Sequence, residues 1–428
     1  MLNGFTHALR LKADPARVVV RPFHLAWQAQ GAHEGRAQQL VEDILALSER
    51  ATKRILKDVF HDFEARHWQT KKVFHKRFDQ IATLLKLDVD KISNVTRTLI
   101  GAYFCHEYSY AAAALMNPSV VPHPDQSGLD KHTTRIVLSL RAVGEGHISS
   151  IAFREGLISA RGRLTLAPEP PFATAAETAL DCDGLFTDGL MEVHRNEDSN
   201  LSGTVIFPVT PAQSNGLEDL RMTLFTHDDG RTEYLGTYTA FSGRGIQSEM
   251  MRTCDFRSFE LVPLKGSAAV NKGMALFPRR IDGKYAMIAR QDNENLYLIY
   301  SDDLHQWDGG QAILKPQFPW EFVQIGNCGS PIELDEGWLL LTHGVGPVRK
   351  YSIGAALLDK KDPSRVLARS VEPLLHPEPS EREGYVPNVV YTCGAMRHND
   401  QIILPYAISD SYSNFATIKI AALMQAMS

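Results

Sequence analysis

The spacing of apolar residues divides the chain into a helical part and a longer part made of strands. Between about residues 34 and 87, apolar side chains recur every three or four positions, with Glu, Lys and Arg between them. This spacing predicts amphipathic helices. A further helix is predicted over 94–115, because Ser93 is a suitable N-cap and Asn117-Pro118 is a suitable stop. The valine-rich run 17–22 predicts a short strand ahead of these helices.

After about residue 118, short apolar or alternating runs follow one another, separated by Gly, Pro, Asn and Asp. No long helical pattern interrupts them, so we predict an all-β region: a barrel, a sandwich or a propeller. One weak repeat favours the propeller, since 253–259 and 301–307 share a small residue, an acid, an apolar residue, two polar residues and an aromatic one. Their aspartates, Asp255 and Asp303, are 48 positions apart, a spacing typical of propeller blades, although chance also produces such short copies. At this period, about 300 residues would make five or six blades.

The composition narrows the classes of protein to consider. The chain has 428 residues and a formal net charge of −5, so it can bury a large core and nothing points to nucleic acid or an anionic membrane. No apolar run approaches the roughly 20 residues that span a bilayer, and the start of the sequence lacks a signal-peptide pattern. The five cysteines are scattered without a C-x-x-C pair, and no metal-ligand motif is present. We therefore expect a cytoplasmic protein with reduced thiols and no bound metal.

One stretch, 215–221, combines acidic and basic side chains at the start of a predicted strand. Neighbouring side chains of an extended strand point to opposite faces, so Glu218 should face away from Asp219, whereas Asp219 and Arg221 should share a face. A carboxylate beside a guanidinium stays ionised unless burial or a ligand offsets the effect. From these residues alone, the stretch is either a surface ion pair at a turn or part of an acidic site.

Several short motifs of the β region occur in the order seen in one known family. In chain order they are Asn117-Pro118, Glu218-Asp219-x-Arg221, Leu276-Phe277-Pro278 with Gly283-Lys284-Tyr285, Ile325-Gly326 with Pro331-Ile332, Glu336-Gly337-Trp338-Leu339-Leu340, His343-Gly344-Val345, and the runs 354–359, 362–369 and 386–390. Through this ordered series, residues from about 115 to 425 resemble glycoside hydrolase family 130, the β-mannoside phosphorylases. The first 110 residues lie outside the resemblance.

The resemblance implies a mainly β fold, with a five-bladed β-propeller over 115–428 and a largely helical N-terminal extension over 1–114. It also implies an inverting glycoside phosphorylase, a hexosyltransferase that cleaves a β-mannosidic bond with inorganic phosphate. The products would be α-mannose 1-phosphate and a shortened sugar, and phosphate would be a co-substrate with no other cofactor. A helical arm of this kind is usually packing surface for its own domain or for a second subunit, which suggests a homo-oligomer.

The resemblance also assigns roles to particular residues. The general acid would be Asp219, passing its proton to the leaving oxygen through a mannose hydroxyl. The phosphate-binding residues would be Lys272, Arg290, His343 and Gln324. The sugar-binding residues would be Asn117, Arg141, Arg221, Tyr385 and Asp410. The family prefers a basic residue at position 324. The glutamine here lowers the expected affinity for phosphate, although its amide can still donate a hydrogen bond. Leu220 replaces the family's common proline, which changes loop stiffness rather than chemistry.

Two other functions are compatible with the same scaffold. An inverting β-mannosidase would need a second carboxylate to activate water, roughly 6.5–9.5 Å from the acid, and Glu218 is a poor candidate if it faces away from Asp219. The positive charge expected at Lys272, Arg290 and His343 also favours phosphate over water as the nucleophile. A non-catalytic glycan-binding propeller would keep the sugar contacts but would not need Asp219.

Overall fold

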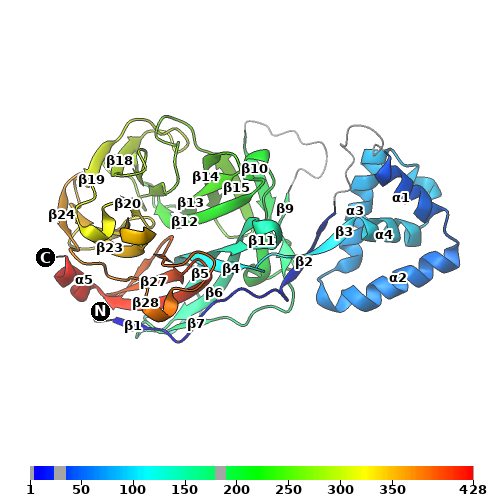
Figure 1. Ribbon diagram of the computed structural model, residues 1–428, viewed down its shortest axis with the longest axis horizontal. Coiled ribbons are helices and arrows are strands. Elements are labelled where there is room, and N and C mark those ends of the chain that lie inside the picture. Colours follow the sequence, from blue (N-terminus) through cyan, green and yellow to red (C-terminus); the bar gives the residue numbers. More distant parts are fainter. Residues whose placement is uncertain (1–3, 24–34, 179–188, 428) are drawn as a thin grey trace.

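Four helices gather at one end of the molecule, apart from the main body of sheets (Figure 1). The computed structural model describes residues 4–23, 35–178 and 189–427, and within these ranges the protein is mainly β. The four helices are α1 (Arg36–Leu45), α2 (Glu49–Phe63), α3 (Thr70–Leu85) and α4 (Asn94–Tyr103). Their apolar stripes form one shared core that includes Val41, Phe78 and Leu99. The prediction of amphipathic helices is thus confirmed for the described part of 34–87.

The helix predicted over 94–115 starts where expected but is shorter. The Ser93 hydroxyl accepts a hydrogen bond from the Thr96 amide at 3.2 Å, which caps the start of α4. The helix ends at Tyr103, because the following residues pair with a distant strand instead of continuing the helical hydrogen bonds. The predicted stop, Asn117-Pro118, lies inside a strand and is not a helix terminator.

A two-stranded ribbon connects the helices with the sheets (Figure 1). It consists of β2 (Val18–Pro22), which confirms the strand predicted at 17–22, and β3 (Cys105–Ser109). The two strands are antiparallel, with Val18 opposite Ser109. Within the described residues no helix is long and apolar enough to cross a membrane.

The largest sheet contains two antiparallel four-stranded units. The first unit consists of β4 (Ala114–Pro122), β5 (Thr134–Val143), β6 (Ser149–Ile158) and β7 (Leu164–Leu166). The second unit consists of β12 (Gly216–Thr226), β13 (Thr232–Phe241), β14 (Ile246–Thr253) and β15 (Ser258–Pro263). The two units meet where Gly216 pairs with Ser149. Four short strands extend the sheet: β8 (Thr174–Ala175), β9 (Glu177–Thr178), β10 (Met191–His194) and β11 (Thr204–Ile206).

Three smaller sheets follow along the chain. The third unit consists of β16 (Ala275–Leu276), β17 (Tyr285–Ala289), β18 (Leu296–Ser301) and β19 (Gln311–Leu314). The fourth consists of β20 (Gln324–Asn327), β21 (Ile332–Glu333), β22 (Trp338–Val345), β23 (Tyr351–Leu358) and β24 (Val366–Arg369). The fifth consists of β25 (Val390–Tyr391), β26 (Met396–His398), β27 (Gln401–Ile408), β28 (Tyr412–Lys419) and β1 (Gly4–Thr6), and helix α5 (Ile420–Ala426) follows it.

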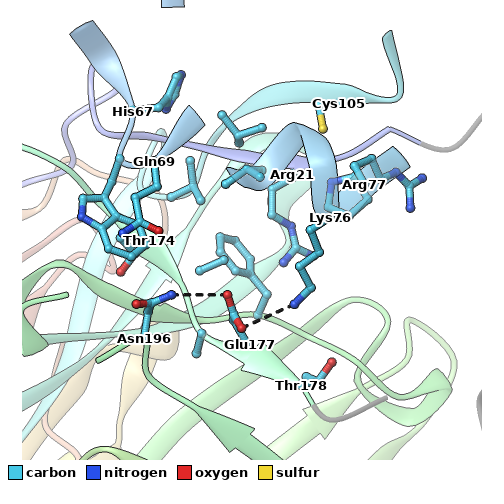
Figure 2. A pocket seen from close by; sticks show the side chains of 18 of the residues that line it. Arg21, His67, Gln69, Lys76, Arg77, Cys105, Thr174, Glu177, Thr178 and Asn196 are labelled. Atoms are coloured by element: carbon cyan, nitrogen blue, oxygen red, sulfur yellow. Dashed lines mark hydrogen bonds and ion pairs between the residues drawn. The ribbon is translucent and has the colours of Figure 1, made fainter. Parts of the chain in front are cut away.

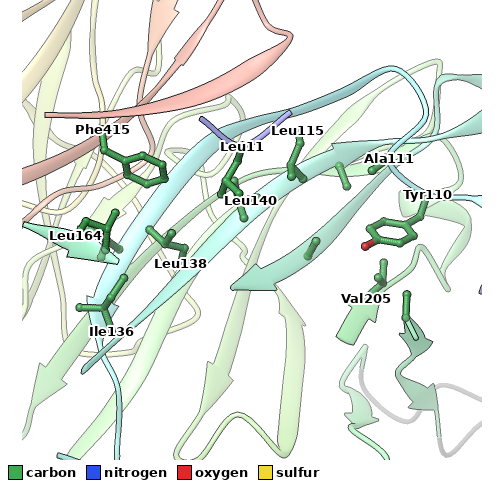
Figure 3. Close-up of a cluster of buried hydrophobic side chains, with 14 of the residues drawn as sticks. Leu11, Tyr110, Ala111, Leu115, Ile136, Leu138, Leu140, Leu164, Val205 and Phe415 are labelled. Carbon is green, nitrogen blue, oxygen red and sulfur yellow. The ribbon is translucent and has the colours of Figure 1, made fainter. Parts of the chain in front are cut away.

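The two ends of the chain meet in the fifth sheet. Strand β1 pairs antiparallel with β28, with Gly4 opposite Ile418. A few residues further on, Leu11 is buried in a cluster that also contains Phe415, Leu138 and Leu164 (Figure 3). The N-terminal segment therefore packs against both the first and the fifth unit.

The two copies of the weak sequence repeat occupy equivalent places in successive units. Each begins at the end of the third strand of its unit and leads toward the fourth strand. In both copies the aspartate accepts a backbone hydrogen bond, Asp255 from the Arg257 amide at 2.8 Å and Asp303 from the His305 amide at 2.9 Å. The closing aromatic residue is buried in each copy. The repeat therefore marks a shared turn, which the hydrophobic pattern alone did not establish.

Candidate functional site

A cavity of about 180 Å³ is lined by residues from all five sheet units. Eight of the ten site residues expected from the sequence lie in its wall: Asn117, Arg141, Asp219, Arg221, Lys272, Arg290, His343 and Asp410. They come from strands and loops that are separated by up to about 290 positions in the sequence, and the fold brings them to one place.

Asp219 lies at the centre of a dense set of donors. Its Oδ1 accepts a hydrogen bond from Asn117 Nδ2 at 2.7 Å and lies 3.4 Å from Arg141 Nη1, while its Oδ2 lies 4.0 Å from Arg221 Nη2. Burial raises the pKa of Asp219, but the charges of Arg141 and Arg221 and the Asn117 hydrogen bond outweigh it and hold the pKa below its usual range. Without a ligand, this carboxylate is therefore ionised at neutral pH.

Asp219 and its hydrogen-bond partner Asn117 both have left-handed backbone conformations. The φ angles are 57° for Asp219 and 49° for Asn117, and each residue lies at an irregularity in the pairing of its strand. Such β-bulges redirect side chains, and left-handed conformations of residues other than glycine store strain that functional sites commonly retain. Two facing bulges thus turn the acid and the amide toward each other.

Glu218 does not face away from Asp219, contrary to the expectation from strand alternation. Its Oε1 accepts a hydrogen bond from Arg141 Nη2 at 2.7 Å, and its Oε2 accepts one from Lys272 Nζ at 2.6 Å. Both carboxylates therefore contact the same arginine. The reason is the bulge between Glu218 and Arg221, which breaks the two-residue period on which the expectation depended.

Three of the four residues expected to bind phosphate line the cavity, and they differ in how many of their polar atoms have hydrogen-bond partners. Lys272 is held by Glu218. The buried Nε of Arg290 and Nδ1 of His343 have no hydrogen-bond partner among the described residues. Buried polar atoms of this kind are rare in folded proteins and commonly bind a ligand or water. These two atoms therefore offer unused hydrogen-bonding capacity at the cavity.

His343 is a neutral side chain at physiological pH. Burial, followed by the charges of Arg290 and Arg221, lowers the pKa of its imidazole well below the usual range. The ring lies against Gly326, where any Cβ would overlap it. Its ring also packs against Tyr351 and Tyr391. His343 is thus fixed in place as a hydrogen-bonding group rather than as a cation.

Asp410 supplies a second carboxyl group to the cavity wall. Burial, and then the charge of Asp219, raises the pKa of Asp410 to about 6. The pKa values of the two carboxyl groups in this cavity are therefore shifted in opposite directions. Asp219 is ionised, whereas Asp410 binds a proton more readily.

Two expected site residues, Gln324 and Tyr385, are not in the wall of this cavity. In the amide orientation that satisfies both of its polar atoms, Gln324 accepts a hydrogen bond from Arg290 Nη1 at 2.7 Å. Gln324 therefore contacts a cavity residue directly. Tyr385 is 44% exposed, and its hydroxyl lies 3.1 Å from His147 Nδ1. Its backbone amide donates to the Ser411 hydroxyl at 2.7 Å, next to Asp410 in the chain.

The cavity wall also includes polar residues that the sequence analysis did not single out, namely Asn327, Arg349, Tyr351 and Tyr391. Tyr391 accepts a hydrogen bond from Arg221 Nη2 at 2.6 Å and so fixes that guanidinium. Asn327 lies in the glycine-rich motif that starts at Ile325, and Arg349 shortly follows the His-Gly-Val motif. Their nearness to motif residues was the available signal. Among the residues described, no group of three or more His, Cys, Asp or Glu side chains is arranged to hold a metal ion.

Comparison with known proteins agrees with the motif series. Residues 186–428 match the family model of glycoside hydrolase family 130, described as beta-1,4-mannooligosaccharide phosphorylase. The chain belongs to glycoside hydrolase family 130. A 1,2-beta-oligomannan phosphorylase from Thermoanaerobacter sp. is 37% identical over 217 residues, which are 49% of this chain and 71% of that protein. A beta-1,2-mannobiose phosphorylase from the same organism is 39% identical over 215 residues, 49% of this chain and 68% of that protein.

Solved structures of this family share the fold. The beta-1,2-mannobiose phosphorylase from Listeria innocua, in complex with beta-1,2-mannobiose, has a TM-score of 0.54 at 21% identity and covers 74% of this chain and 92% of that one. Another is described as showing that the family "contains glycoside hydrolases that target beta-1,2 mannosidic linkages"; its TM-score is 0.51 at 18% identity, over 73% of this chain and 86% of that one. The family match begins at residue 186, so Asn117 and Arg141 lie outside it, and the structure places both in the wall of the same cavity as Asp219.

Proposed function

We propose that this family 130 protein is an inverting β-mannoside phosphorylase. It cleaves a β-mannosidic bond with inorganic phosphate and gives α-mannose 1-phosphate and a shortened sugar. The observation that carries the proposal is the cavity itself, in which one ionised acid, Asp219, lies among several cationic and hydrogen-bonding side chains. The named relatives are phosphorylases of β-mannosides.

The phosphate subsite is proposed around Arg290, His343 and Lys272, with Gln324 positioning the Arg290 guanidinium. The unpartnered atoms of Arg290 and His343 support this, because an inorganic anion would satisfy both. A neutral imidazole donates one hydrogen bond to phosphate without adding a charge. When phosphate binds, Lys272 can share its ammonium between Glu218 and the anion. This set would hold the nucleophilic oxygen in line with the anomeric carbon.

The mannose subsite is proposed around Asn117, Arg141 and Asp410, with Arg221 beneath it and Tyr385 at the rim. A phosphate oxygen attacks the anomeric carbon from one face while the bond to the leaving oxygen breaks on the other. Asp219 supplies the proton to that oxygen through a mannose hydroxyl, since an alkoxide leaves poorly without protonation. Its low pKa would be offset by a phosphate anion, which neutralises part of the neighbouring positive charge. Phosphate binding thereby prepares the acid.

Hydrolysis by the same scaffold is the second candidate function. It needs a carboxylate that activates water, and Asp410 is the other carboxyl group in the described cavity wall. Glu218 is held by Arg141 and Lys272 and is not part of that wall, which counts against it as the base. The cationic and donor groups opposite Asp219 favour phosphate, because a neutral water gains little from them.

Product analysis separates these functions. The purified full-length chain is incubated with β-1,2-, β-1,3- and β-1,4-mannobiose, each with and without inorganic phosphate. We expect mannose 1-phosphate only when phosphate is present, and free mannose regardless of phosphate would establish hydrolysis instead. No turnover of any linkage, with sugar binding retained, would indicate a glycan-binding protein and overturn the proposal.

We also propose that the five sheet units are the blades of a propeller and that 1–114 and 115–428 are the two domains. Five consecutive antiparallel units support this, as do the pairing of β1 with β28 and the contribution of every unit to one cavity. The four described cysteines are free, which supports a reducing, cytoplasmic environment. A homo-oligomer formed through the helices remains part of this proposal, and sedimentation equilibrium tests it.

A further inference from the structure

Asn327 brings a buried amide to the wall of the cavity around Asp219. It is the last residue of strand β20 and is 1% exposed. Among the described residues, neither its Oδ1 nor its Nδ2 has a hydrogen-bond partner. Leaving both groups of a buried amide unpaired is destabilising, and such groups are rare in folded proteins. Asn327 is therefore suited to contact a molecule bound in the cavity.

Two other asparagines in cavity walls each have a protein partner. Asn117 donates a hydrogen bond to Asp219 at 2.7 Å. In a larger cavity of about 340 Å³, between the helices and the sheets, Asn196 donates to Glu177 at 3.5 Å (Figure 2). Asn327 differs from both, because within the described part of the chain its donor and its acceptor are equally unused.

Three observations place Asn327 on the side of the cavity proposed to bind phosphate. The residue before it in β20 lies opposite His343 in the sheet. The first residue of the same strand contacts Arg290. The Asn327 Oδ1 also lies 3.8 Å from the position that a Cβ would take on Gly273, the residue after Lys272. The amide is therefore close to all three side chains of the proposed phosphate subsite that line the cavity.

The amide adds a hydrogen-bond acceptor to a group of donors. Lys272 and Arg290 can only donate hydrogen bonds, and the neutral His343 donates one in the proposed subsite. Asn327 can donate through Nδ2 and accept through Oδ1. Inorganic phosphate keeps a P–O–H group at neutral pH, and this group needs an acceptor. Sulfate has the same shape but carries no proton at neutral pH, so it has nothing to donate.

We propose that Asn327 contacts phosphate directly and selects it over sulfate. Its Nδ2 donates to an unprotonated phosphate oxygen, and its Oδ1 accepts the hydrogen bond of the P–O–H group. Sulfate would leave Oδ1 unpaired and close to a negatively charged oxygen, which is unfavourable. The inference rests on the proposed phosphorylase function, and it adds to the phosphate subsite a residue that discriminates between two anions.

Isothermal titration calorimetry of the full chain with inorganic phosphate and with sulfate, in the presence of excess mannose, tests the proposal. We expect the wild type to bind phosphate about tenfold or more tightly than sulfate, the effect of one good hydrogen bond. Asn327→Ala should weaken phosphate binding about tenfold or more and sulfate binding less, so the preference for phosphate should largely disappear. The matched control is Asn200→Ala, at an exposed position outside the cavity, which should bind both anions like the wild type.

Asn327→Asp keeps the test decisive if Asn327→Ala does not fold, because it preserves the shape of the side chain. The carboxylate retains the acceptor, loses the donor and adds a negative charge. Both anions should therefore bind more weakly, whereas the preference for phosphate should remain.

Two results would overturn the inference while leaving phosphate binding in place. These are an unchanged affinity for phosphate in the Asn327 variants, and equal affinities of the wild type for phosphate and sulfate. Absence of phosphate binding by the wild type would instead overturn the proposed phosphate subsite, and this inference with it.

Discussion

The protonation state of Asp219, the proposed general acid, is set by side chains that come from three different strands. Asn117 of β4, Arg141 of β5 and Arg221 of β12 all favour the ionised carboxylate. A general acid with a low pKa donates readily but is rarely protonated. Phosphate bound at the proposed subsite would resolve this, because the anion would reduce the net positive charge that Asp219 experiences.

Replacing the acid tests its role directly. Asp219→Asn should lower the rate of mannobiose phosphorolysis by at least about 10²-fold, since positioned proton donation contributes roughly 10²–10⁴-fold. Folding should be retained, because the amide can still contact Asn117. The matched control is Asp302→Asn, whose side chain is 81% exposed. Phosphate-dependent release of mannose 1-phosphate provides the measurement, and full activity in Asp219→Asn would remove this residue from the mechanism.

Asp410 makes stability depend on pH in a defined window. Its pKa is about 6 in the folded protein and about 3.9 when unfolded, so between these values the folded state binds the extra proton. The free energy of unfolding should therefore fall as pH rises from about 4 to 6. Asp410→Asn should match the wild type near pH 4 and be more stable by about 3 kcal/mol above pH 6.5.

Urea unfolding of the two proteins at pH 4 and pH 7 measures this difference. Asp400→Asn, at an exposed position, controls for a general effect of removing one negative charge. A difference between Asp410→Asn and the wild type that is the same at both pH values would contradict the raised pKa.

Gly326 controls the position of His343. A Cβ at residue 326 would overlap the imidazole ring of His343, so Gly326→Ala should displace that ring from the proposed phosphate subsite. We expect the KM for phosphate to rise about tenfold or more, the effect of losing one good hydrogen bond, with a smaller change in the KM for the sugar. Gly245→Ala is the control, since a Cβ there has its nearest neighbour at 4.0 Å. An unchanged KM for phosphate would show that His343 does not contact it.

The elements that sequence reasoning predicted best are those specified by local pattern. Helices in the described part of 34–87 follow the three- and four-residue spacing of apolar side chains. The predicted end of α4 was wrong, because residues 105–109 do not continue the helix. They pair instead with β2, more than 80 positions earlier in the chain. The bulge at Asp219 was missed for a similar reason. A left-handed aspartate is uncommon and is stabilised here by contacts from distant strands.

The packing of α4 on α3 depends on one glycine. A Cβ at Gly101 would overlap the Phe74 carbonyl of the neighbouring helix, so the two backbones approach closely there. Gly101→Ala should destabilise the helices by about 1–3 kcal/mol, the usual cost of overpacking. Gly35→Ala, with no atom within 4 Å of the new Cβ, should have little effect. Thermal unfolding followed by circular dichroism at 222 nm measures the change, and equal stability of both variants would contradict the close approach.

Eight predicted site residues converge on one cavity, although they are distributed along the chain from Asn117 to Asp410. The family resemblance assigned roles to these residues, but neither periodicity nor spacing indicates that they meet. The arrangement arises because every sheet unit directs part of its chain toward the same cavity. The resemblance assigned no role to Arg349, which reaches the cavity from a turn where Val348 and Arg349 both have positive φ.

The N-terminal segment adds β1 to the fifth unit and Leu11 to a core shared with the first unit. Leu11→Ala should therefore lower the free energy of unfolding by about 2–5 kcal/mol, whereas Leu367→Ala, at a position 46% exposed, should change it little. If this segment joins the first and fifth units, the loss affects all five units together. The unfolding midpoints measured by tryptophan fluorescence and by circular dichroism should then shift by the same denaturant concentration. Separate transitions would show that the fifth unit unfolds alone.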